Sequence, residues 1–120
     1  MKENLLLDKS FAFSVRVVNA YKHLVKVEKE FVFSKQFLRS GTSVGANAEE
    51  AAGAQSRNDF VSKLAIAYKE ARETKYWIRL LHATGFLDGA QSKSLLNDTK
   101  ELLRIIGKIQ VTTKRNIRNS

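Results

Sequence analysis

The sequence from Arg39 to Gly53 places the strongest constraint on how the helices pack: it reads Arg39-Ser-Gly-Thr-Ser-Val-Gly-Ala-Asn-Ala-Glu-Glu-Ala-Ala-Gly53. Nearly all its side chains are small, it has no proline, and its apolar residues repeat at the period of a helix. Gly41 and Gly45 each cost such a helix about 1 kcal/mol relative to alanine, so a closely packed neighbouring helix must offset them. The residues expected to face that neighbour are Phe37, Ser40, Gly41, Val44, Ala48, Ala51 and Ala52.

Polar residues occupy the other side of this stretch. They are Arg39, Ser43, Asn47 and Glu50. One interpretation is a solvated edge on an inner helix, and the other is a polar ridge buried against another helix or another subunit. We expect a structural role, with Arg39 and Glu50 in a hydrogen-bonded network alongside Ser43 and Asn47.

Composition bounds the class of protein. With 120 residues, 43% hydrophobic and 28% charged, the chain predicts one ordinary globular domain over residues 1–120. It has no cysteine, no signal-peptide pattern and no apolar run of the roughly 18 residues that a membrane span needs, so we expect a cytoplasmic location and no membrane partner. The absence of proline favours long helices.

Hydrophobic periodicity predicts four helices with short turns. Their expected ranges are about 10–27, 34–53, 57–83 and 89–113, followed by a frayed basic tail at 114–120. Ser34 and Ser56 are the expected N-caps, and Gly53 and Gly85 the expected helix ends. The predicted fold class is all-α, an antiparallel up-and-down four-helix bundle.

The first and third helices are apolar on two sides. In the first helix we expect Phe11, Val15, Val18 and Val25 in the core. A second apolar side on two helices exceeds what a monomeric bundle needs and predicts a homo-oligomer. The residues expected at the oligomer interface are Phe13, Val17, Leu24, Ile66, Trp77 and Leu80.

The core stripes of the third and fourth helices are simpler to predict. They consist of Phe60, Leu64, Ala67, Ala71, Ile78 and Leu81, then Leu95, Leu102, Ile106 and Ile109.

No catalytic, cofactor or metal site is predicted. His23 and His82 are the only histidines, and neither has the Glu three positions earlier that di-iron bundles use. Glu70 and Glu73 are flanked by Lys69, Arg72 and Lys75, so we expect ion pairs along the helix surface. Neither Ser40 nor Ser43 lies in a nucleophile-elbow or phosphate-loop motif. The chain is therefore not expected to be an enzyme.

The net charge of +9 is concentrated at the C-terminal end, where residues 91–120 hold seven Lys and Arg against two acids. We predict a nucleic-acid-binding surface there, with a solvated surface that only aids solubility as the alternative. No aromatic residue follows Phe86, so contacts would go to phosphates more than to bases. The predicted binding residues are Lys93, Lys100, Arg104, Lys108, Lys114, Arg115 and Arg118.

Several segments together resemble a known family. They are the 39–51 stretch, Asp59-Phe60, Leu64 to Ala67, and Glu73 to Ile78. The chain resembles, over nearly its whole length, the small bacterial four-helix-bundle proteins found in intervening sequences of 23S rRNA genes. Arg39, Ser40, Ser43, Val44, Asn47, Glu50 and Ala51 occupy the positions of the family motif, whereas Ala48 stands where the family usually has isoleucine. The resemblance implies a ring-shaped homopentamer, related to accessory proteins of diversity-generating retroelements, which bind nucleic acid and a reverse transcriptase.

Two functional hypotheses follow. The first is a non-enzymatic, homo-oligomeric protein that binds nucleic acid, with RNA favoured, through the basic C-terminal helix. The second is a protein-interaction scaffold or accessory subunit, for example of a reverse transcriptase, with no direct RNA role.

Overall fold

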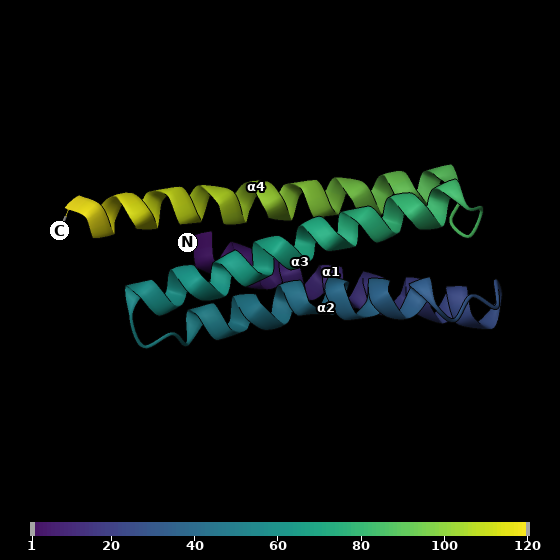
Figure 1. Ribbon diagram of the computed structural model, residues 1–120, viewed down its shortest axis with the longest axis horizontal. Helices are drawn as coiled ribbons and strands as arrows, with labels where there is room; N and C mark the ends of the chain where they lie inside the picture. The colour runs from purple at the N-terminus through teal and green to yellow at the C-terminus, as the bar shows by residue number, and fades with distance from the viewer. Residues whose placement is uncertain (1, 120) are drawn as a thin grey trace.

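The computed structural model describes residues 2–119, with side chains from residue 5 onward, and all its regular structure is helical. The helices are α1 (Lys2–Lys26), α2 (Phe33–Ala52), α3 (Arg57–Ala83) and α4 (Gly89–Asn119). They form a rod of 52 × 21 × 21 Å in which the chain reverses direction at each turn (Figure 1). α2 packs against α1 and α3, and α4 packs against α3 and more sparsely against α1. Among the described helices, none offers the length of apolar sequence that crossing a bilayer would require.

The glycines of α2 allow α1 to come close, as the sequence predicted. A Cβ placed on Gly41 would lie 2.7 and 2.8 Å from the two γ-methyl groups of Val17. A Cβ on Gly45 would lie 3.1 Å from the hydroxyl of Ser14 and 3.2 Å from the carbonyl oxygen of Ser10. The small-residue side of α2 is buried at every predicted position except Ala52, which is exposed because it ends the helix.

The prediction for the two apolar sides of α1 is wrong. Phe13, Val17 and Leu24, expected at an oligomer interface, are at most 2% exposed and belong to the core of the single chain. Phe11 and Val15, expected in the core, are 67% and 47% exposed. Both sides are comparably apolar. The side that also carries Ser10 and Ser14 is the one that fits against the glycines of α2.

Two helix ends also differ from prediction. α1 begins near Lys2 instead of residue 10, because Leu6 continues the buried stripe and is 3% exposed. α4 continues to Asn119, so the segment expected to fray is helical over its described residues. The helix can continue because no glycine or proline follows Gly107, and because cations near a helix C-terminus interact favourably with the helix dipole. α4 therefore extends beyond the other helices at its C-terminal end (Figure 1).

The N-cap residue of α2 is Val32 and not Ser34 as predicted, and the side chain that caps the helix comes from Glu30. The Glu30 carboxylate accepts hydrogen bonds from the backbone N–H groups of Val32, Phe33 and Ser34 at 3.0, 3.1 and 2.6 Å. Burial raises the pKa of Glu30, but these hydrogen bonds outweigh it, so its pKa lies below the ordinary value. The carboxylate thereby satisfies first-turn donors that would otherwise lack partners.

The remaining cap and core predictions agree well with the structure. Ser56 accepts the backbone N–H of Asp59 at 3.0 Å, as expected for an N-cap. Gly85 has φ of +88° and ends the turn after α3. Every predicted core residue of α3 and α4 is buried, except Phe60, which is partly buried against the same core.

Candidate nucleic-acid interface and the polar cluster of α2 and α3

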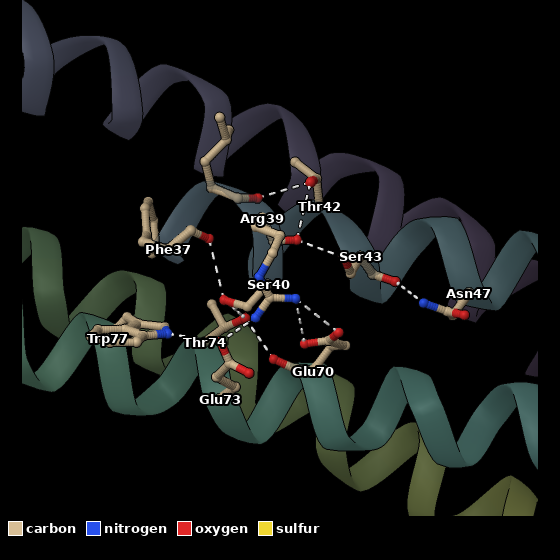
Figure 2. Close-up of polar contacts among 11 residues, drawn as sticks. Phe37, Arg39, Ser40, Thr42, Ser43, Asn47, Glu70, Glu73, Thr74 and Trp77 are labelled. Carbon is tan, nitrogen blue, oxygen red and sulfur yellow. Dashed lines mark hydrogen bonds and ion pairs between the residues drawn. The ribbon is translucent and has the colours of Figure 1, made fainter. Parts of the chain in front are cut away.

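A cluster of charged and polar side chains joins α2 to α3 (Figure 2). Arg39 extends from α2, and its Nη1 donates to both carboxylate oxygens of Glu70 at 3.1 and 3.3 Å. Its Nη2 donates to the carboxylate of Glu73, one turn further along α3. The side chain of Glu70 is 11% exposed and that of Arg39 is 48% exposed, so the pair lies at the boundary of the core.

This pairing corrects two predictions. Glu50 is exposed on α2 and, among the described residues, has no side-chain hydrogen bond or ion pair, so it is not the partner of Arg39. Glu70 and Glu73 pair across the helices with Arg39, not along α3 with its own lysines and arginines. Positions in one helix could not indicate which residue of another helix would face them.

Ser43 and Asn47 join the cluster only through the backbone of α2. The Ser43 hydroxyl donates to the carbonyl oxygen of Arg39 at 2.6 Å, and the Asn47 amide donates to that of Ser43 at 2.9 Å. Deeper between the helices, the hydroxyl of Thr74 lies 2.9 Å from that of Ser40. These contacts support a structural role for the motif.

The electrostatics of the cluster favour its ionised form. The hydrogen bond from the Trp77 indole, at 2.9 Å, lowers the pKa of Glu73; burial opposes this and Arg39 reinforces it, so the pKa lies below its ordinary value. Hydrogen bonds to Glu73 and Glu70 raise the pKa of Arg39. Arg39 and Glu73 thus stabilise each other in their charged forms.

The two serine hydroxyls of the motif are engaged with their own helix. Ser40 and Ser43 both lie within hydrogen-bonding distance of backbone carbonyls of α2, and among the described residues no basic side chain forms a hydrogen bond with either hydroxyl. Within residues 2–119, no three His, Asp or Glu side chains are grouped so that they could hold a metal ion.

The outward surface of α4 carries a row of cations, which we call the basic surface of α4. All of its members are exposed, and none has an ion pair or hydrogen bond within the described part of the chain. Its members are the seven predicted binding residues, Lys93, Lys100, Arg104, Lys108, Lys114, Arg115 and Arg118.

Both acids of α4 are paired with residues of α1. Asp98 accepts a hydrogen bond from Arg16 of α1 at 2.5 Å, and Glu101 accepts one from Lys9 at 3.2 Å. Because both acids are paired with α1, they do not neutralise the outward cations. The basic surface of α4 is therefore locally uncompensated, and such a field attracts polyanions.

Sequence reasoning missed a second set of cations on α3. Arg72, Lys75 and Arg79 have no ion pair within the described chain, because Arg39 holds the carboxylates that were expected to pair with two of them. Their spacing of three and four residues is visible in the sequence. The interpretation of Glu70 and Glu73 as their partners concealed it.

The other predicted interface residues, Ile66, Trp77 and Leu80, are half-buried on α3. Trp77 stacks on Phe33 of α2 with ring centroids 6.2 Å apart, so part of its surface is used within the chain. Contact of these residues with another subunit stays a prediction.

Comparison with known proteins identifies the family. A family model described as 23S rRNA-intervening sequence protein matches residues 2–108. The crystal structure of a protein of unknown function from the S23 ribosomal protein family of Bacteroides thetaiotaomicron VPI-5482 matches with a TM-score of 0.91 at 54% sequence identity. The match covers 92% of this chain and 98% of that chain. Among curated proteins, none matches. The chain belongs to the 23S rRNA-intervening sequence protein family.

Proposed function

We propose that this chain is a non-enzymatic, cytoplasmic protein that binds RNA by contacting phosphates with the basic surface of α4. The observation that carries the proposal is the pairing pattern of α4: Asp98 and Glu101 are paired with α1, while the outward cations have no side-chain partner among the residues that the structure describes. Of the two nucleic acids, we favour RNA over DNA. Lys93, Lys100, Arg104 and Lys108 fall within the residues matched to the family, and the other three cations extend the surface beyond them.

The assembly we propose is an antiparallel four-helix bundle that associates into a homo-oligomer, a pentamer as the family resemblance implies. One apolar surface available for association is the outward side of α1, where Phe11 and Val15, one turn apart, are 67% and 47% exposed. Large exposed apolar side chains grouped on one side mark interaction surfaces. Repetition of the basic surface around a ring would raise avidity without new contacts per subunit.

Binding of a labelled structured RNA across a salt series tests the proposal. If about six phosphates are contacted, the logarithm of the affinity falls with the logarithm of salt concentration at a slope of about −4 to −5. The double substitution Arg104→Glu with Lys108→Glu should weaken binding at least tenfold, since it removes two phosphate contacts and adds repulsion.

The matched control is Lys22→Glu with Lys35→Glu. Both residues are exposed, Lys22 on α1 and Lys35 on α2, and neither belongs to α3 or α4. Each double variant lowers the net charge of +9 by four, so a general charge effect would weaken both equally. Equal loss in both variants, or unchanged affinity for the α4 variant, would refute the assignment to α4.

Sedimentation velocity of Phe11→Glu tests the association surface. We expect a smaller species than wild type, because a charge replaces the most exposed aromatic of α1. Asn19→Glu, an exposed polar position of the same helix, is the control and should keep the wild-type sedimentation coefficient. Identical coefficients for all three proteins would rule out this side of α1.

A second candidate function is a scaffold for another protein, such as a reverse transcriptase. The α1–α2 connection favours it, because Val27, Phe31 and Val32 are 63%, 51% and 67% exposed. Two results together would support this alternative. RNA binding would be undetectable at low salt, and the double variant Phe31→Ser/Val32→Ser would lose a protein that co-purifies with wild type.

A further inference from the structure

An open groove of about 320 Å³ runs between α3 and α4. Three of its lining residues are cations, two are tyrosines, and none is acidic. Leu103 precedes Arg104, so the groove borders the basic surface of α4. The residues that line this α3–α4 groove are Tyr68, Arg72, Lys75, Tyr76, Arg79 and Leu103.

The cations of the groove are available to a ligand. Arg72 and Arg79 are exposed, Lys75 is half-buried, and none of them has an ion pair or hydrogen bond in the described structure. The reason lies on the neighbouring side of α3, where Arg39 holds both nearby carboxylates. The groove therefore carries a net positive charge with nothing in its lining to neutralise it.

The tyrosines add planar surfaces to this charge. Tyr76 is 52% exposed, and its ring meets Trp77 edge-to-face at 5.0 Å and 76°, which leaves at least one face of the Tyr76 ring open. Tyr68 lies against the backbone of α4, where a Cβ on Gly107 would be 3.7 Å from its Cε2. From Tyr68 to Arg79 the groove follows about 16 Å of helix, the length of about five stacked nucleotides.

We infer that the α3–α4 groove binds a short single-stranded segment of RNA, with a base stacked on Tyr76 and phosphates on Arg72, Lys75 and Arg79. The inference rests on the proposed function and adds a preference for single strands. A duplex keeps its bases inside the helix and has none to offer a tyrosine, whereas an unpaired base stacks on aromatic rings. An acidic peptide would meet the positive charge but would not need the open ring.

Fluorescence anisotropy of the full-length protein tests this. The probes are a labelled unstructured single-stranded RNA of about 12 nucleotides and a duplex RNA of the same length. Tyr76→Leu keeps an apolar side chain but removes the ring, and we expect about 5- to 10-fold weaker binding of the single strand with the duplex changed less than about 2-fold. Equal effects on both probes, or no effect on the single strand, would overturn the stacking assignment.

The charge of the groove is tested with Arg72→Gln plus Arg79→Gln. This variant should reduce the salt slope for the single strand by about 1.4, since each lost phosphate contact removes about 0.7. The matched control, Lys22→Gln plus Lys35→Gln, has the same net charge, lies on α1 and α2, and should keep the slope. Circular dichroism and sedimentation of each variant verify the fold and the oligomer.

A local signal comes from Trp77, the single tryptophan of the chain, which contacts Tyr76. The single strand should change Trp77 fluorescence in wild type and in Arg104→Glu/Lys108→Glu, but not in Arg72→Gln/Arg79→Gln. Poly-glutamate that produces the same change at equal affinity would overturn the nucleotide assignment in favour of an acidic protein.

The two proposals fail separately. Loss of RNA binding in the α4 double variant with no effect of the groove variants overturns the groove and leaves the proposed function intact. The reverse result keeps the groove and removes the assignment to α4. Absence of any RNA binding at low salt overturns both.

Discussion

Replacing Gly41 with alanine should destabilise the protein, although alanine is the better helix former. The substitution by itself gains about 1 kcal/mol of helix propensity. The new Cβ, however, would lie 2.7 and 2.8 Å from the γ-methyl groups of Val17, closer than carbon atoms pack. Val17 is fully buried and β-branched, so it has few other rotamers and no space to move into. Overpacking costs about 1–3 kcal/mol, and contacts this short place Gly41→Ala in the upper part of that range, at about 2–3 kcal/mol. After the gain in helix propensity, the predicted net loss is about 1–2 kcal/mol.

Urea unfolding followed by circular dichroism, at one fixed protein concentration, measures this loss. Gly107→Ala is the matched control, because Gly107 is also inside a helix but its Cβ would meet only a Tyr68 ring carbon at 3.7 Å. The control should therefore be stabilised by up to about 1 kcal/mol, so the two variants shift in opposite directions.

A compensating substitution tests the cause. Val17→Ala removes the two methyl groups that the Cβ of residue 41 would meet, so Gly41→Ala should cost less in that background than in wild type. If Gly41→Ala is as stable as wild type, or shifts with Gly107→Ala, the close approach of α1 and α2 does not explain the glycine.

Three further predictions concern the polar contacts. Arg39→Met should lower the free energy of unfolding in urea by about 1–3 kcal/mol, because it leaves the nearly buried Glu70 without its partner. Glu50→Gln should stay within about 0.5 kcal/mol of wild type. Equal losses in the two variants would contradict the assigned pairing. Glu30→Gln should cost about 1–2 kcal/mol, because a neutral amide is a weaker acceptor for the backbone N–H groups of Val32, Phe33 and Ser34 at the start of α2. An unchanged urea midpoint would show that the cap contributes nothing. The folded-state pKa values of Glu30 and Glu73 lie below the ordinary 4.5, so their stabilisation is full above about pH 4.5 and is lost as the pH falls through the folded values. Urea midpoints from pH 7 to pH 3 should therefore fall less steeply in Glu30→Gln/Glu73→Gln than in wild type, and parallel curves would argue against both shifts.

The periodicity of apolar residues is enough to predict the buried side of a helix that has only one apolar side. The core stripes of α3 and α4 each have a single continuous apolar side, so the spacing of residues such as Leu64, Ile78 and Ile106 is enough to assign them to the core. The close packing of α2 follows from the cost of two glycines in a helix, which only a neighbouring backbone could offset. The exposed cations of α4 could be predicted in the same way, because the helical repeat alone places them on one side of the helix.

The tertiary structure decided the choices that the sequence left equivalent. α1 has two apolar sides, and shape complementarity with Gly41 and Gly45 selects the one with Ser10 and Ser14, which the spacing of apolar residues does not measure. The partner of Arg39 depends on which turn of α3 lies opposite, so Glu70 could not be chosen over Glu50 from one helix. That pairing also determines which cations of α3 stay uncompensated beside Tyr76. The sequence determined the helices and their buried stripes because these depend on local spacing, and only the tertiary structure decided which sides meet, because that depends on the fit of surfaces far apart in the chain.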